Sequence, residues 1–135
     1  MHKYQFDEKN KVWIREDYIR TIDYSDGAEV EQRIYAAIRN SSDLSSLSDE
    51  LETHIFNWAS HYFFSKKRAN LLRPFASVFK DKYLLEPGCG SGTITRFLGE
   101  CGAHVYAVEP NLQRARAAAE RCRDLPHVKV FWDDI

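Results

Sequence analysis

The sequence has few cysteines and no set of residues spaced like metal ligands. Only three cysteines occur among the 135 residues, Cys89, Cys101 and Cys122, and no two of them form a CxxC pair. A disulfide framework or a structural zinc site is therefore not expected. The five histidines are scattered along the chain without the spacing of a metal site. We consequently assign no metal to this protein.

The sequence also lacks an excess of one charge and any long apolar run. Its formal net charge is −1, which argues against nucleic acid or an anionic membrane as a partner. No apolar run approaches the roughly 18 residues of a membrane span. The polar N-terminus, MHKYQFDEKNK, lacks the apolar centre of a secretion signal. We therefore expect a cytoplasmic globular protein.

The first 60 residues predict a mixed α+β region. The segment KYQFDEKNKVWI, residues 3–14, reads as a hairpin, and residues 17–27 read as a further strand closed by a turn. Apolar residues at helical spacing predict a helix over 28–40. A second helix, opened by a serine cap, is predicted over 48–63.

A further helix is predicted over 65–80, with Ser65 as its cap. Pro74 is expected to kink or restart this helix, because proline lacks the backbone N–H group that a helix interior uses. The apolar stripe that we expect this helix to bury consists of Leu71, Leu72, Phe75 and Phe79.

From residue 82 onward the pattern alternates between strand and helix. Apolar strands are predicted at 82–86, 104–109 and 128–132, with a helix in each interval. This alternation predicts a parallel sheet with right-handed crossovers. Gly102 is expected to close the first helix and Pro110 to lie in the first turn of the second. The second helix is basic, and we expect a solvated face that includes Arg114, Arg121 and Arg123.

Glycine is scarce, yet three of the six glycines stand at alternate positions in one stretch, LLEPGCGSGTIT, residues 84–95. They fall where a predicted strand ends and a helix begins, so a ligand can approach backbone amides there. The dinucleotide pattern G-x-G-x-x-G is not met, because Thr93 occupies its last position. Glu86 is an unfavourable neighbour for a pyrophosphate but a suitable one for an ammonium group.

The segment LLEPGCGSGTITRFL, residues 84–98, resembles the first motif of class I S-adenosylmethionine-dependent methyltransferases. Glu109 matches the acidic residue at the end of their second strand, which accepts hydrogen bonds from the ribose hydroxyls. The segment VKVFWDDI matches the end of their third strand, where an aspartate reaches the adenine amino group. Asp134 is the better match for that aspartate, and Asp133 is the alternative.

The resemblance also implies roles for residues before the glycine turn. Residues 60–75, SHYFFSKKRANLLRPF, resemble a helix of methyltransferases found beside bacterial surface-polysaccharide glycosyltransferases. Tyr62 would flank the cofactor there, and Arg68 is a candidate for its carboxylate, with core packing and a solvated face as the alternatives. The implied S-adenosyl-L-methionine site comprises Glu86, Gly88, Cys89, Gly90, Gly92, Glu109, Pro110, Asp134 and Tyr62.

The resemblance implies a partial Rossmann-like methyltransferase fold over 61–135, preceded by a hairpin and helical region over 1–60. Family members continue beyond a third strand, so we interpret the chain as the N-terminal part of a larger enzyme. The acceptor implied is a sugar or small-molecule hydroxyl, and we assign no catalytic residue. The alternatives are a non-catalytic interaction module and an NAD-dependent oxidoreductase fragment.

The predicted topology places both crossover helices on one face of the sheet. The other face would then be apolar and uncovered, at a cost of about 25 cal/mol per Å², and the first parallel strand would be an edge. We therefore expect either the N-terminal 60 residues or a second copy of the chain to contact that face or edge.

Overall fold

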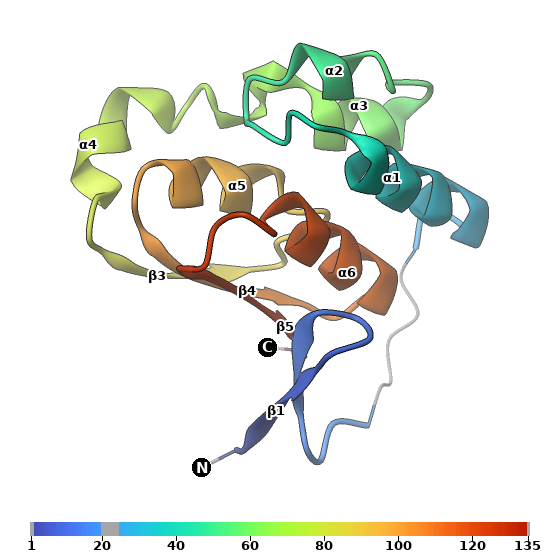
Figure 1. The fold of residues 1–135 in the computed structure, drawn as a ribbon, viewed down its shortest axis with the longest axis vertical. Coiled ribbons are helices and arrows are strands. Elements are labelled where there is room, and N and C mark those ends of the chain that lie inside the picture. The colour runs from blue at the N-terminus through green and yellow to red at the C-terminus, as the bar shows by residue number, and fades with distance from the viewer. Residues whose placement is uncertain (1, 20–24, 135) are drawn as a thin grey trace.

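The computed structural model describes residues 2–19 and 25–134. It is an α/β fold built on one mixed sheet of five strands in the order β1-β2-β5-β4-β3 (Figure 1). The strands are β1 (Tyr4–Asp7), β2 (Val12–Arg15), β3 (Tyr83–Pro87), β4 (His104–Glu109) and β5 (Val128–Trp132). The α-helices are α1 (Ala28–Asn40), α2 (Asp49–Glu52), α3 (Trp58–Phe64), α4 (Ala76–Phe79), α5 (Thr93–Glu100) and α6 (Leu112–Arg121).

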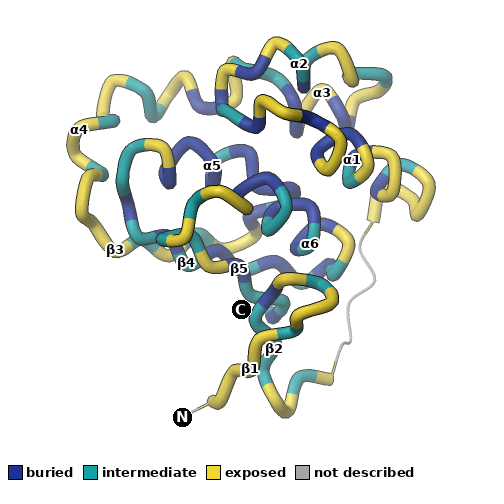
Figure 2. The backbone as a smooth tube through the Cα atoms, in the orientation of Figure 1, coloured by how far each residue is buried: buried dark blue, intermediate teal, exposed yellow. Residues whose placement is uncertain are grey.

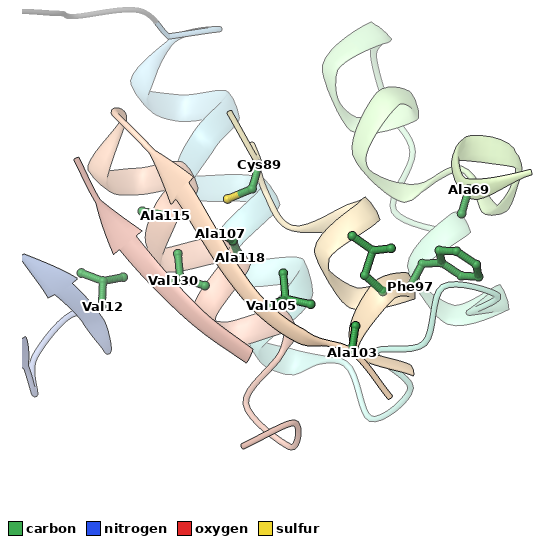
Figure 3. Packing of buried hydrophobic residues seen from close by; sticks show 11 residues of the cluster. Val12, Ala69, Cys89, Phe97, Ala103, Val105, Ala107, Ala115, Ala118 and Val130 are labelled. Carbon is green, nitrogen blue, oxygen red and sulfur yellow. The ribbon is translucent and has the colours of Figure 1, made fainter. Parts of the chain in front are cut away.

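The parallel part of the sheet agrees with the sequence prediction. β3 pairs with β4 and β4 with β5, both in parallel, and α5 and α6 are the connections between them. Val105, Ala107 and Val130 point toward these helices and are almost completely buried. Together with Phe97 they form the centre of the core shown in Figure 3. Gly102, with a φ of 84°, follows the end of α5 as predicted.

The predicted N-terminal hairpin is present and extends this sheet. β1 and β2 pair antiparallel, and β2 then pairs in parallel with β5 through Trp13 and Phe131. The side chain of Asp7 accepts hydrogen bonds from the amides of Lys9 and Asn10, which holds the turn between the two strands. Strands from both sides of the predicted boundary at residue 60 therefore share one sheet. Residues 20–24 of the strand predicted over 17–27 lie outside the described ranges, and the prediction is wrong for residues 17–19 and 25–27, which form no strand.

The N-terminal helices pack on the helix layer, not on the bare side of the sheet. α1 lies against α6, and α2 and α3 continue that outer layer (Figure 1). Ile34 and Ile38 of α1 and Phe64 of α3 are almost fully buried in this second cluster. Of the two expected contacts with the other sheet face, cover by the N-terminal 60 residues is therefore not found among the described residues. The hydrophobic stripe of α1 is matched by the small alanines of α6, which allow a close approach.

The single helix predicted over 48–63 is two helices. Ser48 caps α2 as predicted, since its hydroxyl accepts a hydrogen bond from the Leu51 amide at 3.0 Å. A new helix, α3, begins after Asn57, whose side-chain oxygen accepts from the Ser60 amide at 2.9 Å while the Ser60 hydroxyl accepts from the Asn57 amide. This reciprocal capping box starts a second helix inside one continuous apolar pattern.

The long helix predicted over 65–80 is also absent. Ser65 is a cap as predicted, but the segment forms two 3₁₀ turns, Lys66–Ala69 and Arg73–Phe75, before the short α4. Leu71 is 87% exposed and Phe75 56% exposed, so the predicted buried stripe is wrong for these two residues. No helix within the described part of the chain has both the length and the apolar character for crossing a bilayer.

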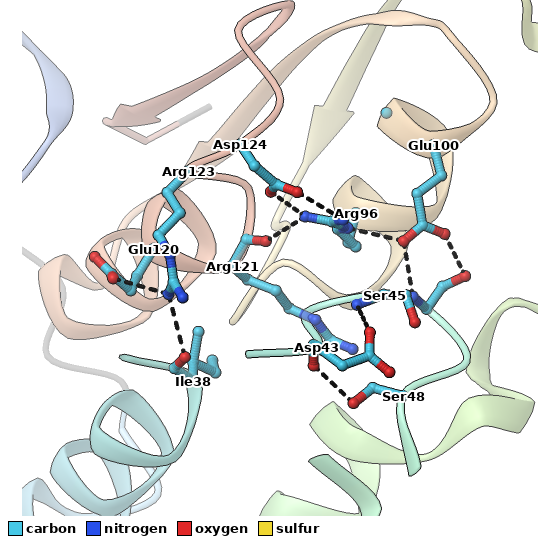
Figure 4. Close-up of polar contacts among 12 residues, drawn as sticks. Ile38, Asp43, Ser45, Ser48, Arg96, Glu100, Glu120, Arg121, Arg123 and Asp124 are labelled. Carbon is cyan, nitrogen blue, oxygen red and sulfur yellow. Dashed lines mark hydrogen bonds and ion pairs between the residues drawn. The ribbon is translucent and has the colours of Figure 1, made fainter. Parts of the chain in front are cut away.

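The predicted solvated face of the second basic helix is exposed at Arg123, as predicted, but not at Arg114 and Arg121. Arg114 and Arg121 are buried, because α1 packs on this helix and the Phe63 carbonyl of α3 lies against Arg121. Arg121 donates to the carbonyl of Phe63 at 2.5 Å, and Arg123 donates to the carbonyls of Ile38 and Ser41. Figure 4 shows the side of this network that includes Arg121 and Arg123. The arginines therefore join the N-terminal helices to the sheet layer.

Candidate functional site

The glycine turn joins the end of β3 to the start of α5. Gly88, Gly90 and Gly92 have φ values of 68°, 57° and 82°, in the left-handed region that side chains disfavour. The amides of Gly88 and Cys89 donate to the Val108 carbonyl of β4 at 2.8 and 3.1 Å. The turn is therefore fixed to the neighbouring strand.

The three glycines meet different surroundings. A Cβ atom on Gly92 would lie 2.8 Å from the backbone of Ala118 in α6, so this glycine lets the two helices approach. One on Gly90 would lie 2.8 Å from the ring of Phe63, whereas one on Gly88 would meet nothing within 4 Å. The sequence suggested that Gly88 and Gly90 both leave space for a ligand. In the structure only Gly88 has open space where a side chain would lie.

This difference predicts unequal costs for two substitutions at similar φ. Gly88→Ala is expected to lose about 1–2 kcal/mol of the free energy of unfolding, the cost of a left-handed alanine. Gly92→Ala is expected to lose about 1–3 kcal/mol more, because helix backbone must move to admit the methyl group. Urea denaturation of both variants beside the wild type measures the difference. Equal losses would contradict the assigned contact with Ala118.

A cavity of about 420 Å³ lies between the turn and the outer helix layer. It brings together four residues that the sequence proposed, Gly88, Gly90, Glu109 and Tyr62. The residues of its lining that sequence reasoning did not assign to the site are Asp26, Trp58, Ala59, Phe63 and Arg114.

Glu109 is the buried acid of this cavity, with 4% of its surface exposed. One carboxylate oxygen accepts from the Gly90 amide at 2.8 Å and the other from the Asn111 amide at 2.9 Å. Burial raises the pKa of Glu109, and these two amides and the Arg114 guanidinium partly offset that rise. The end of β4 is therefore joined to the glycine turn through the Glu109 carboxylate. Each of its two oxygens accepts one of these hydrogen bonds and has a second lone pair for a ligand.

Glu86 lies beneath the turn and is absent from the cavity lining. Its Oε2 atom is buried without a hydrogen-bond partner, as are the hydroxyls of Ser91 and Thr95. Burial raises the pKa of Glu86 to about 7, and the nearby Thr95 hydroxyl offsets part of the rise. Burial therefore favours the neutral form of this carboxyl well above the pH at which an exposed glutamate ionises.

The remaining predicted residues lie outside the cavity lining. The carboxylate of Asp133 is buried, accepts from the Tyr4 hydroxyl at 2.7 Å and pairs with Arg15 at 3.0 Å. Asp134, the preferred match for adenine, follows it with a more exposed side chain. Cys89 is buried, and burial raises the pKa of its thiol. Pro110 precedes Asn111, the N-cap of α6, so its predicted place in the first turn of that helix is wrong.

Two aromatic residues on α3 face the site from the outer layer. Tyr62 is 41% exposed, and the guanidinium of Arg68 lies 3.6 Å over its ring and donates to its hydroxyl. Arg68 itself is not part of the lining. Trp58, one turn before Tyr62, is 79% exposed and stacks on His61. An exposed tryptophan beside a cavity offers a flat apolar surface to a ligand.

Arg114 connects the cavity to the N-terminal region. Its Nε donates to Glu31 at 2.8 Å, and one of its terminal nitrogens donates to Asp26 at 2.6 Å. Both partners lie more than 80 positions earlier in the sequence, so no local pattern could have indicated the pairs. The helical periodicity that placed Arg114 on a solvated face could not show that another helix covers that face.

Searches of protein-family models, curated proteins and solved structures gave no match to this chain. Within residues 2–19 and 25–134, no three His, Cys, Asp or Glu side chains come together as metal ligands.

Proposed function

We propose that this chain binds S-adenosyl-L-methionine, as the cofactor-binding portion of a methyltransferase with a Rossmann-like sheet. The observation that carries the proposal is the meeting of two features in one cavity. The open space at Gly88 and the buried carboxylate of Glu109 both border it, from the ends of neighbouring parallel strands. The ends of parallel strands are where open α/β sheets bind their ligands.

The cavity suits such a ligand in size and chemistry. Its volume of about 420 Å³ falls in the usual range of small-molecule pockets, roughly 300–1,000 Å³. Glu109 has lone pairs left for the two ribose hydroxyls, and Trp58 and Tyr62 offer rings to a planar base. Glu86 and Asp134, which the resemblance assigns to the ammonium and adenine groups, do not border the cavity. The proposed site therefore rests on Gly88, Glu109 and Tyr62.

The bound cofactor would supply a methyl group already activated by its sulfonium. The residues of this chain then bind and orient it, which accounts for much of the rate in such transfers. A sugar or small-molecule hydroxyl is the proposed acceptor. We nominate no base for it.

The experiment is titration calorimetry with S-adenosylhomocysteine and, separately, NAD. We expect the first to bind and Glu109→Ala to weaken it at least tenfold, because hydrogen bonds to a charged group contribute about 1.5–3 kcal/mol. Glu16→Ala, at an exposed site on the far hairpin, is the matched control. Thermal melts verify that both variants fold.

The other outcomes separate the alternatives. Binding that Glu109→Ala leaves unchanged would contradict the assigned site. Binding of NAD in place of S-adenosylhomocysteine would favour an oxidoreductase fragment. Binding of neither compound by the folded wild type would overturn the proposal and favour a non-catalytic interaction module.

A further inference from the structure

The sheet face opposite α5 and α6 carries a row of aromatic side chains that crosses all five strands. Neighbouring ring centroids along the row lie 5.3, 6.2, 6.1 and 6.5 Å apart. The rings, taken from β1 across to β3, belong to Phe6, Trp13, Phe131, Tyr106 and Tyr83.

This face is apolar and uncovered among the described residues. Tyr83 and Leu85 of β3 are 72% and 69% exposed, and β3 is among the exposed segments in Figure 2. A shallow hollow of about 370 Å³ between β1 and β3 is lined by tyrosine, leucine, valine and phenylalanine side chains. Parallel strands are ordinarily covered on both faces, because their side chains are apolar on both.

The chain supplies no cover for this face from its described parts. All the α-helices lie on the other side of the sheet (Figure 1), and the hairpin lengthens the sheet edgewise. Exposed apolar surface of this kind costs about 25 cal/mol per Å². A contiguous patch of several hundred Å² is typical of an interaction site.

We propose that this face is the contact between two copies of the chain, packed sheet against sheet about a two-fold axis. Taking roughly 200 Å² per large side chain, the exposed fractions of Tyr83, Leu85, Phe6 and Tyr4 leave on the order of 400 Å² uncovered. The partly buried rings of the row raise this to roughly 600 Å² per copy, or about 1,200 Å² for two. Specific, stable protein–protein interfaces bury about 1,200–2,000 Å², so this contact would lie at the lower end of that range.

The charges on the face restrict how an identical copy can contact it. A two-fold contact brings the same surface together from both sides, so an unpaired charge would face its own kind. Asp133 is already paired with Arg15 at 3.0 Å. The exposed Lys129 side chain has no ion pair among the described residues, and its ammonium lies 5.5 Å from the ring of Trp13 and 5.8 Å from that of Tyr106. The Lys129 side chains of the two copies must therefore lie apart in the contact. Pairing through the β3 edge alone would leave the whole row uncovered, so the face is the favoured contact.

The test is sedimentation equilibrium of the full chain between about 1 and 100 µM. We expect a mass of twice 15.8 kDa for the wild type. Leu85→Lys places a charge among the most exposed apolar side chains of the contact, and we expect it to raise the dimer dissociation constant at least 100-fold. Because Leu85 is already exposed in the single copy, the circular dichroism spectrum should stay unchanged. The melting temperature should fall only by the part that dimer formation contributes.

The matched control is Leu71→Lys, which changes an even more exposed leucine away from the sheet. It should leave the dimer intact. A monomeric wild type at 100 µM would overturn the proposal and assign the face to a different polypeptide. A dimer that survives Leu85→Lys, or one that Leu71→Lys dissociates as readily, would equally overturn it. None of these results depends on cofactor binding.

Discussion

Glu31→Ala is expected to lower the free energy of unfolding by about 3 kcal/mol. The Glu31 side chain is 2% exposed and accepts from the Nε of Arg114 at 2.8 Å, and Arg114 is itself buried. Removing one partner of a buried ion pair leaves an uncompensated buried charge, which costs about 3–5 kcal/mol. The lower value applies here, because Asp26 remains as a second partner for the guanidinium. Urea denaturation monitored by circular dichroism measures the loss.

Glu29→Ala on the same helix provides the control, since Glu29 is exposed and the substitution should change stability by less than about 0.5 kcal/mol. The double variant Glu31→Leu with Arg114→Met removes both charges together. It should recover much of the stability, because an apolar pair can replace a buried ion pair at little cost. If Glu31→Ala were no more harmful than Glu29→Ala, the pair with Arg114 would not hold α1 on α6.

Glu86→Gln is expected to stabilise the protein at alkaline pH and to have little effect at acidic pH. The pKa of Glu86 rises from 4.5 to about 7 in the folded protein, because burial disfavours its charged form. The folded state therefore holds this proton more tightly than the unfolded state does, and stability falls as pH rises from 4.5 to 7. One pKa unit corresponds to about 1.4 kcal/mol, so ionised Glu86 costs about 3 kcal/mol above pH 7.

The measurement is urea denaturation of the wild type and Glu86→Gln at several values of pH between about 4.5 and 8. The two should be similar at pH 4.5, and the variant should gain up to about 3 kcal/mol by pH 8. Glu16→Gln, at an exposed residue, should follow the wild-type profile. Parallel profiles for wild type and Glu86→Gln would show that this carboxyl ionises in the folded protein as freely as in the unfolded one.

Glu86→Gln also separates two roles for this residue. If Glu86 is only a buried structural acid, Glu86→Gln should keep the affinity for S-adenosylhomocysteine. If Glu86 instead pairs with the ligand's ammonium group, as the resemblance implies, the variant should lose affinity, since the glutamine side chain carries no charge. The same protein samples serve both measurements.

Sequence reasoning found the parts of the site that local patterns carry. Alternating glycines between an apolar strand and a helical stripe identified the turn, and the acid closing the next strand identified Glu109. Their convergence follows from parallel pairing, which places the ends of adjacent strands at one edge. Asp134 failed to reach the cavity because Tyr4 and Arg15 of the distant hairpin hold the neighbouring Asp133.

The amino-acid sequence by itself determined the local elements of this protein. These are the three parallel strands, the hairpin, the helices α1, α5 and α6, and the left-handed turn that only glycine forms readily. Local patterns are sufficient to predict each of these elements, because the apolar residues, caps and turn residues that define one lie within a few positions of one another. Where two patterns ran together, as in residues 48–63 and 65–80, the boundaries were missed.

Only the tertiary structure decided which surfaces meet. It placed the N-terminal helices on α6, buried the guanidinium groups of Arg114 and Arg121, added Trp58 to the cavity and left the aromatic row open. The physical reason is that burial depends on what packs against a face, and periodicity reveals only that the face exists. An arginine on a solvated helix and one paired across the core have the same sequence signature.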